Sequence, residues 1–205
     1  MTALAKVTKM RADATRRSIR REETKLELAA YAVAAISELG YARMGLRDIA
    51  AISGRSVGAL TYHFDDKNDL ICFCVRNYKE RFVSDIDQII ALDIPQDDKL
   101  AAILDGLAGT IEADAATHRL WYDIRSQALF EEAFQKVVSD IEASLIDMTG
   151  RIVDAVGMRP ETTTAAYHIL DGLFQRHLHL ACRNTGWNPE DMVDEMSSGL
   201  AFLME

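Results

Sequence analysis

Apolar residues along the chain recur at intervals of three and four, which is the spacing of one face of an α-helix. The segment from about Glu22 to Leu39 shows this spacing in Leu26, Ala29, Val33 and Ile36. Gly40 follows directly, and glycine in that place is typical of a helix C-terminus. Because no stretch alternates polar and apolar residues long enough for a strand, the pattern predicts an all-α protein.

The same spacing predicts two short helices at about Leu46–Ser53 and Val57–His63, and a long helix at about Lys67–Ala91. Gly54 permits a turn between the two short helices. Ser56 is suited to cap the second one, because its hydroxyl can accept a hydrogen bond from a free N–H group. Five more helices follow, at about Asp97–Ala115, Thr117–Leu129, Glu131–Val156, Pro160–Asn184 and Pro189–Met204.

The composition fits a folded protein that stays out of the membrane. Hydrophobic residues make up 49% of the 205 residues, which is enough for a buried core. No apolar run of about 18 residues indicates a membrane span, and no secretory signal is recognisable. Cys72, Cys74 and Cys182 form a sparse, odd set without metal-ligand spacing, so we expect reduced thiols, a cytoplasmic location and no metal or cofactor.

Charge is unevenly distributed along the chain. The net charge is −9, but residues 1–21 hold seven basic residues and one acid, Asp13. The basic residues are Lys6, Lys9, Arg11, Arg16, Arg17, Arg20 and Arg21. This asymmetry favours a flexible basic arm that approaches nucleic acid, although a solvated terminus without a partner has the same composition.

The most informative segment is Gly40–Leu70, which reads GYARMGLRDIAAISGRSVGALTYHFDDKNDL. Two short helices joined by a glycine turn and followed by a long helix indicate a helix-turn-helix, whose second helix enters the major groove of DNA. Gly58 and Ala59 are small enough to let that helix approach the bases, and Tyr62 and His63 offer polar tips to phosphates.

This segment resembles the N-terminal pattern of the TetR (tetracycline-repressor-like) family. The matching positions are Gly40, Tyr41, Leu46, Arg47, Asp48, Ile49, Ala50, Ser53, Gly54, Ser56, Gly58, Ala59, Leu60, His63, Phe64, Lys67 and Leu70. Met44, Arg55, Val57 and Thr61 depart from residues usual in the family, which bears on the DNA sequence recognised and leaves the fold unaffected. The resemblance implies a helix-turn-helix domain at 22–66 and an effector-binding and dimerisation domain at 67–205.

The resemblance also implies which residues contact DNA. Phosphate contacts fall to Ser56, Tyr62, His63 and Lys67, with Arg47 and Arg55 as further candidates. Base contacts fall to Arg55, Val57, Gly58 and Thr61. Other interpretations stay open: Arg47 could pair with an acid of the first helix, His63 could be a packed histidine, and Lys67 could be a solvated helix start.

In the family, two such units act as a homodimer, and the resemblance implies that helices 160–184 and 189–204 pair with their mates in a four-helix bundle. Two apolar stripes support this, although both could instead face the protomer's own core. One stripe comprises Ile169, Leu170, Leu173, Phe174, Leu178 and Ala181, and the other comprises Met192, Met196, Leu200 and Leu203.

Helices between Asp97 and Val156 would enclose an effector pocket. The candidate lining residues are His118, Trp121, Tyr122, Arg125, Phe134 and Met148, which mix aromatic and polar groups at helical spacings. If Arg125 points inward, it suits a carboxylate or phosphate on the effector. Trp121 could equally be core, and Arg125 could form a surface ion pair with Asp123 or Glu131.

The function that follows from the resemblance is a DNA-binding transcriptional regulator, a repressor that a small molecule releases from its double-stranded operator. A ligand-independent regulator or an activator is the alternative. No nucleophile–base pair, phosphate-binding glycine loop or HExxH motif is present in the sequence, so we expect no enzyme activity.

Overall fold

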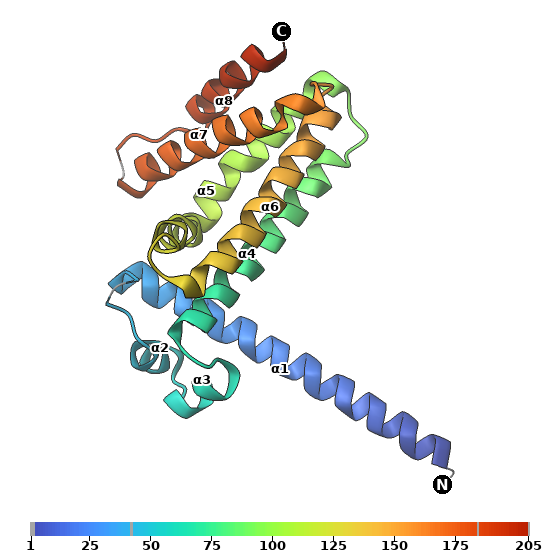
Figure 1. Ribbon diagram of the computed structural model, residues 1–205, viewed down its shortest axis with the longest axis vertical. Coiled ribbons are helices and arrows are strands. Elements are labelled where there is room, and N and C mark those ends of the chain that lie inside the picture. The colour runs from blue at the N-terminus through green and yellow to red at the C-terminus, as the bar shows by residue number, and fades with distance from the viewer. Residues whose placement is uncertain (1–2, 42, 184, 205) are drawn as a thin grey trace. The chain divides into compact units, whose positions relative to one another are not determined.

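The computed structural model describes residues 3–41, 43–183 and 185–204, and within these ranges the regular structure is helical with no strand (Figure 1). The prediction of an all-α fold is confirmed. The chain forms two compact units, Met1–Cys74 and Val75–Glu205, so the boundary falls inside a helix rather than at its start. Every helix in the described ranges is too short or too polar to cross a lipid bilayer.

The first unit consists of α1 (Ala3–Leu39), α2 (Leu46–Ser53), α3 (Val57–His63) and the start of α4 (Lys67–Ile90). Helix α1 begins at Ala3, well before the predicted start, because residues 3–21 contain neither glycine nor proline and many good helix formers. The side chains of Lys6, Lys9 and Arg11 lie outside the described residues. The buried face of α1 is also rotated from the predicted one: Leu26 is 40% exposed, whereas Leu28 is buried.

Local sequence fixes the turn between α2 and α3. Gly54 has φ +64°, a left-handed conformation that glycine adopts without steric cost. Ser56 then caps α3 as predicted, because its Oγ accepts a hydrogen bond from the Ala59 N–H at 3.1 Å. At the start of α2, the Gly45 N–H donates to the Asp48 carboxylate at 2.7 Å.

The second unit contains the rest of α4, followed by α5 (Gln96–Gln127), α6 (Glu132–Ala155), a short 3-10 turn (Pro160–Thr162), α7 (Thr163–Arg183) and α8 (Pro189–Met204). Two predicted helices are joined in α5, but its backbone leaves helical geometry at Asp114 (φ −135°, ψ 25°). The two parts of α5 accordingly run in different directions (Figure 1). Arg81 of α4 pairs with Asp114 at 3.0 Å.

Helix α8 packs against α5 and α7, and this packing decides where its apolar stripe points. Met192, Met196 and Leu200 are at most 1% exposed, so this stripe faces the core of its own unit rather than a free surface. The stripe predicted on α7 divides: Leu170, Phe174 and Leu178 are buried, while Ile169, Leu173 and Ala181 remain partly exposed. For these three residues the structure shows the alternative in which the stripe faces the protomer's own core, while Leu203, the fourth residue of the stripe, is partly exposed.

Candidate nucleic-acid interface and ligand cavity

Helix α3 presents an outer face to solvent. Tyr62 is 72% exposed and Val57 is 38% exposed, and Gly58 and Thr61 are exposed as well. On the opposite side, Leu60 is fully buried and holds α3 against its own unit. The structure thus brings four of the sequence-predicted contact residues to one accessible surface of a capped, seven-residue helix.

Arg55 lies in the turn before α3 and pairs with a residue of α1. Its guanidinium contacts both carboxylate oxygens of Glu27, at 3.1 and 2.9 Å, and both side chains are about half exposed. Both contacts come from one nitrogen, Nη2, so this is a charge-assisted ion pair without the parallel two-nitrogen geometry. A DNA contact by Nη2 of Arg55 would compete with the Glu27 carboxylate.

A basic surface adjoins α3. Arg16, Arg17 and Arg20 are exposed on α1, and the Arg21 guanidinium lies 5.9 Å from the centre of the Tyr62 ring. Arg47 is exposed on α2, and no hydrogen bond or ion pair of its side chain is found within the described ranges. These charges give α3 positively charged surroundings of the kind that attract phosphates.

His63 and Lys67 have partly structural surroundings. Burial, followed by Arg21, Lys25 and Arg55, lowers the pKa of His63 below its usual value, which favours the neutral imidazole. Lys67 Nζ donates hydrogen bonds to the backbone carbonyls of Tyr41 at 3.0 Å and Met44 at 3.1 Å. Lys67 therefore secures the loop before α2 and is not simply a solvated residue at the start of α4.

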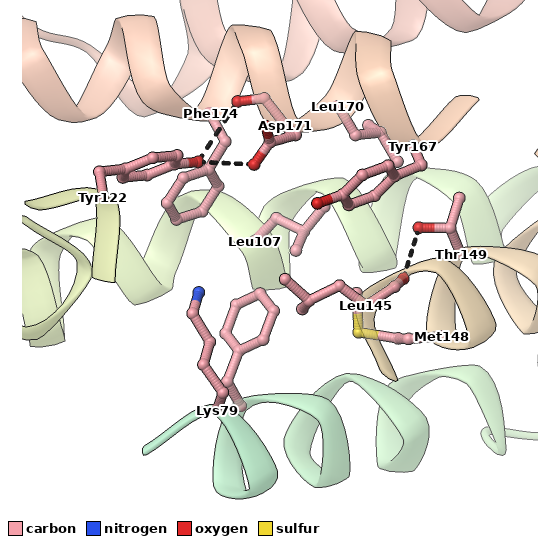
Figure 2. A pocket seen from close by; sticks show the side chains of 11 residues that line it. Lys79, Leu107, Tyr122, Leu145, Met148, Thr149, Tyr167, Leu170, Asp171 and Phe174 are labelled. Atoms are coloured by element: carbon pink, nitrogen blue, oxygen red, sulfur yellow. Dashed lines mark hydrogen bonds between the residues drawn. The ribbon is translucent and has the colours of Figure 1, made fainter. Parts of the chain in front are cut away.

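The second unit contains a small cavity of about 40 Å³ (Figure 2). It is lined by Lys79, Phe82, Leu107, Tyr122, Leu145, Met148, Thr149, Tyr167, Leu170, Asp171 and Phe174. Its lining, mostly apolar with a few polar groups, has the composition typical of a small-molecule site. These residues come from α4, α5, α6 and α7, so closing the cavity requires all four helices.

The sequence-predicted effector residues divide between the cavity and the core. Tyr122 and Met148 line the cavity, whereas His118, Trp121 and Phe134 are buried outside its lining. The His118 ring packs on aromatic neighbours, with its centre 4.5 Å from that of Phe174, and its Nε2 is 2.6 Å from the Tyr78 hydroxyl. Burial, and then the charge of Lys79, lowers the pKa of His118 to about 2, so this imidazole stays neutral.

Arg125 is already paired inside its own unit. Its guanidinium contacts the carboxylates of Asp171 at 2.6 Å and Glu142 at 2.7 Å, rather than Asp123 or Glu131. The Tyr122 hydroxyl donates to the same Asp171 at 3.0 Å, as Figure 2 shows. Asp171 therefore joins Arg125 to the cavity wall and has its charge balanced there.

The sequence interpretation missed Lys79, Tyr167 and Asp171. A signal was present for Lys79, which falls within the apolar stripe of α4 between Val75 and Phe82, where a lysine is unusual. Nothing comparable marks Tyr167 or Asp171, because which face of α7 meets α5 and α6 depends on the tertiary packing. Among the described residues, no group of three His, Cys, Asp or Glu side chains could hold a metal ion.

Comparison with known proteins agrees with this geometry. Residues 28–71 match the family model described as bacterial regulatory proteins of the tetR family. An HTH-type transcriptional regulator of Mycobacterium tuberculosis is 27% identical over 159 residues, which cover 76% of this chain and 80% of the relative.

Two solved structures share the fold at low identity. A TetR transcription regulator from Haloarcula marismortui is 21% identical, with a TM-score of 0.70 over 89% of this chain and 97% of that one. The transcriptional regulator FadR from Bacillus subtilis, in complex with stearoyl-CoA, is 17% identical, with a TM-score of 0.64 over 88% of this chain and 97% of that one.

The fold and these matches first define the chain as a helix-turn-helix, DNA-binding transcriptional regulator and not an enzyme. Within that class, residues 28–71 match the model of the tetR family of bacterial regulatory proteins. The resemblance found in Gly40–Leu70 is thereby confirmed.

Proposed function

We propose that the chain is a homodimeric repressor, which binds a palindromic operator through α3 of each protomer and leaves it when a small molecule occupies the cavity. The observation that supports this proposal most directly is the exposed outer face of α3, a capped helix that presents Val57, Gly58, Thr61 and Tyr62. An operator is chromosomal DNA, so this function places the protein in the cytoplasm.

Roles for the DNA contacts follow from exposure. The methyl groups of Val57 and Thr61 suit thymine methyls, and Gly58 lets the helix backbone approach the base edges. Arg55 suits a guanine edge after it leaves Glu27. Tyr62 and Arg47, both exposed, suit phosphates, which set the register of the helix in the groove. The N-terminus of α3 at Ser56 lies at the same surface.

His63 and Lys67 are weaker candidates for phosphate contacts. The His63 pKa is lowered, which makes the cationic form less available, and Lys67 Nζ already donates to two carbonyls. A phosphate contact by Lys67 would have to add to these hydrogen bonds or replace one of them.

Dimerisation is supported by a shallow groove on α7 and α8, lined by Ile169, Gly172, Leu173, Asp194, Glu195, Ser198 and Gly199. Small residues let helices approach closely, and Ile169 and Leu173 supply partly exposed apolar surface. Phe202, 80% exposed on α8, adds to the apolar surface of that helix. A pair of such surfaces, related by a two-fold axis, would form a self-complementary interface.

Release by a small molecule is supported by the cavity in the second unit and by the stearoyl-CoA complex of the FadR neighbour. Helix α4 takes part in both units, because it begins at Lys67 and contributes Lys79 and Phe82 to the cavity. A ligand that changes the preferred tilt of α4 would change the spacing between the recognition helices of the dimer. The alternative, a ligand-independent regulator or an activator, would leave DNA affinity unchanged by any compound bound in the cavity.

The test is selection of bound sequences from a random double-stranded DNA library by the purified protein, at two salt concentrations. We expect enrichment of a palindrome with half-sites about one helical turn apart, and a sequence preference that persists at the higher salt. Binding that disappears with modest salt and enriches no sequence would contradict the proposal.

A further inference from the structure

Lys79 is the most unusual ionisable residue of the second unit. It is a buried lysine of α4, 5% exposed, and its side chain extends into the cavity (Figure 2). Lysines are almost never buried to this degree unless they are paired with an opposite charge.

No hydrogen bond or ion pair to Lys79 Nζ is found among the residues that the structure describes. Instead, the ammonium lies near aromatic rings, 4.6 Å from the centre of Phe82 and 5.5 Å from that of Trp121. Such cation–π contacts recover only part of the hydration that a buried ammonium loses. The cavity therefore holds a cation whose hydrogen-bonding capacity is unused.

A second polar group of the cavity is also unpartnered. The Tyr167 hydroxyl of α7 is buried without a hydrogen-bond partner, and Figure 2 shows it directed into the space above Leu145. Buried polar groups in native proteins are nearly always hydrogen-bonded, so two unpartnered donors in one cavity indicate a ligand that supplies the acceptors.

The single acidic residue of the lining does not offer a site for a cation. Asp171 is held by Arg125 at 2.6 Å and by the Tyr122 hydroxyl at 3.0 Å, which balances its charge. The remaining lining is dominated by apolar side chains, including Leu107, Met148 and Phe174. The cavity thus combines an unpaired cation with apolar walls.

We propose that the effector is a small amphipathic organic anion, with one carboxylate that pairs with Lys79 Nζ and an apolar body packed against the cavity walls. This inference rests on the proposed function, in which a small molecule occupies this cavity. The Tyr167 hydroxyl offers a donor for a second, uncharged acceptor on the same molecule.

The charge state of Lys79 agrees with this assignment. Burial lowers its pKa to about 7, with Asp171 opposing this shift and Arg125 adding to it. The other titratable groups nearby stay neutral at that pH: burial holds the pKa of His118 at about 2, and it raises those of Tyr78, Tyr122 and Tyr167. A bound carboxylate would stabilise the ammonium, so binding should take up protons and become tighter as the pH falls from 8.5 to 6.5.

The experiment uses matched pairs of compounds on the full chain. The acids are octanoate and 3-phenylpropanoate, and the neutral partners are octanamide and 3-phenylpropanamide. Binding is measured by thermal shift and by the methionine methyl NMR signal of Met148, a lining residue whose signal is assigned by its loss in Met148→Leu. We expect each acid to bind at least about tenfold more tightly than its amide, the difference usual for a charge-assisted hydrogen bond.

The variant that tests the residue is Lys79→Met, which keeps the length and removes the charge. We expect it to lose the preference for acid over amide and to lose the pH dependence of binding. Lys136→Met is the matched control, because Lys136 lies on α6 in the same unit with its side chain 83% exposed. If Lys79→Met does not fold, the comparison of acid with amide on the unaltered chain still tests whether the cavity prefers an anion.

The inference is overturned if the amides bind as tightly as the acids, if Lys79→Met binds the acids like the unaltered chain, or if neither acid perturbs the Met148 signal. None of these results bears on whether another compound releases operator DNA. Conversely, acids that bind through Lys79 without weakening DNA binding would support the inference and count against the proposed release mechanism.

Discussion

Two lysines of α4 show how position decides the behaviour of one residue type. Lys67, at the start of the helix, donates to the carbonyls of Tyr41 and Met44, and its ammonium lies 4.2 Å from the centre of the Tyr41 ring. Lys79, three turns later, is more deeply buried and meets aromatic rings only. Burial lowers the pKa of both lysines, and it lowers that of Lys79 to about 7.

This difference predicts a pH dependence of stability. Lys79 has a folded-state pKa of about 7, and its unfolded-state pKa is about 10.4. Between these values the unfolded chain binds a proton that the folded chain lacks, so Lys79 makes the unfolding free energy rise with pH by up to about 1.4 kcal/mol per pH unit. Below pH 7 both states are protonated, and the destabilisation by Lys79 is then complete.

Urea unfolding between pH 6.5 and 9.5, at one protein concentration, measures this slope. We expect the unfolding free energy of Lys79→Met to rise less steeply with pH than that of the unaltered chain, by up to about 1.4 kcal/mol per pH unit. We also expect the variant to be more stable at pH 7. Lys136→Met should keep the original slope. Equal slopes for all three proteins would show that Lys79 does not titrate in this range.

At the scale of single residues, the sequence predicted which side chains are exposed on α3 better than which side chains line the cavity. Val57, Thr61 and Tyr62 could be assigned to the outer face of α3 from helical spacing and the family pattern, and the structure places them on its surface. His118 and Trp121 also have helical spacing, but they pack outside the cavity lining. Spacing alone does not say how deep in the core a side chain lies.

At the scale of elements, α3 is a short helix that carries a glycine at a cost to its own stability. Gly58 lies inside it, although glycine costs about 0.5–1 kcal/mol relative to alanine in a helix. A Cβ atom there would meet nothing closer than the Ser56 Oγ at 3.9 Å, so no packing within the first unit requires glycine.

We therefore expect Gly58→Ala to raise the unfolding free energy by about 0.5 kcal/mol while weakening operator binding about tenfold, because the methyl would separate α3 from the base edges. Gly109→Ala in α5 is the matched control, since a Cβ there would also meet no neighbour within 4 Å. It should stabilise similarly without changing DNA affinity. Unchanged operator affinity for Gly58→Ala would mean that this part of α3 does not approach the bases.

Most helices could be predicted because a period of three to four residues and flanking glycines or prolines mark them. The exceptions are instructive. The start of α1 was placed too late because residues 3–21 carry charge rather than an apolar face, although nothing in them breaks a helix. The break in α5 carries no glycine or proline, and Arg81 instead contacts the residue where the backbone departs, Asp114.

At the scale of the whole molecule, the proposed homodimer has a sharp test in Gly172. This residue is exposed on α7 within the shallow groove, and a Cβ there would meet no neighbour within 4 Å. We expect Gly172→Glu to leave the protomer folded and to raise the dimer dissociation constant about 100-fold or more, because it would bury two unpaired charges at the two-fold axis.

Analytical ultracentrifugation over a dilution series measures this change. Ala143→Glu, which adds the same charge to the exposed face of α6, should leave the oligomeric state unchanged. A Gly172→Glu protein that remains dimeric at the same concentrations would show that the interface lies elsewhere.

The apolar stripe of α8 explains why the partner surface could not be predicted in full. Its sequence pattern is the same whether the stripe meets its own core or a second chain, and Met192, Met196 and Leu200 meet their own core. Gly199 contributes to that choice, because a Cβ in its place would come within 2.8 Å of the Ile169 side chain of α7. Glycine at position 199 therefore allows α8 to pack closely on α7.

The contact between Arg55 and Glu27 has a consequence for discrimination among DNA sequences. Because Arg55 already has a carboxylate partner, moving it to an isolated phosphate exchanges one anion for another and gains little free energy. A guanine edge offers two acceptors in a geometry that matches the guanidinium, and it compensates better for the lost partner. Glu27 would then act as an internal competitor that suppresses adhesion to bulk DNA and makes the affinity of Arg55 conditional on the base it meets.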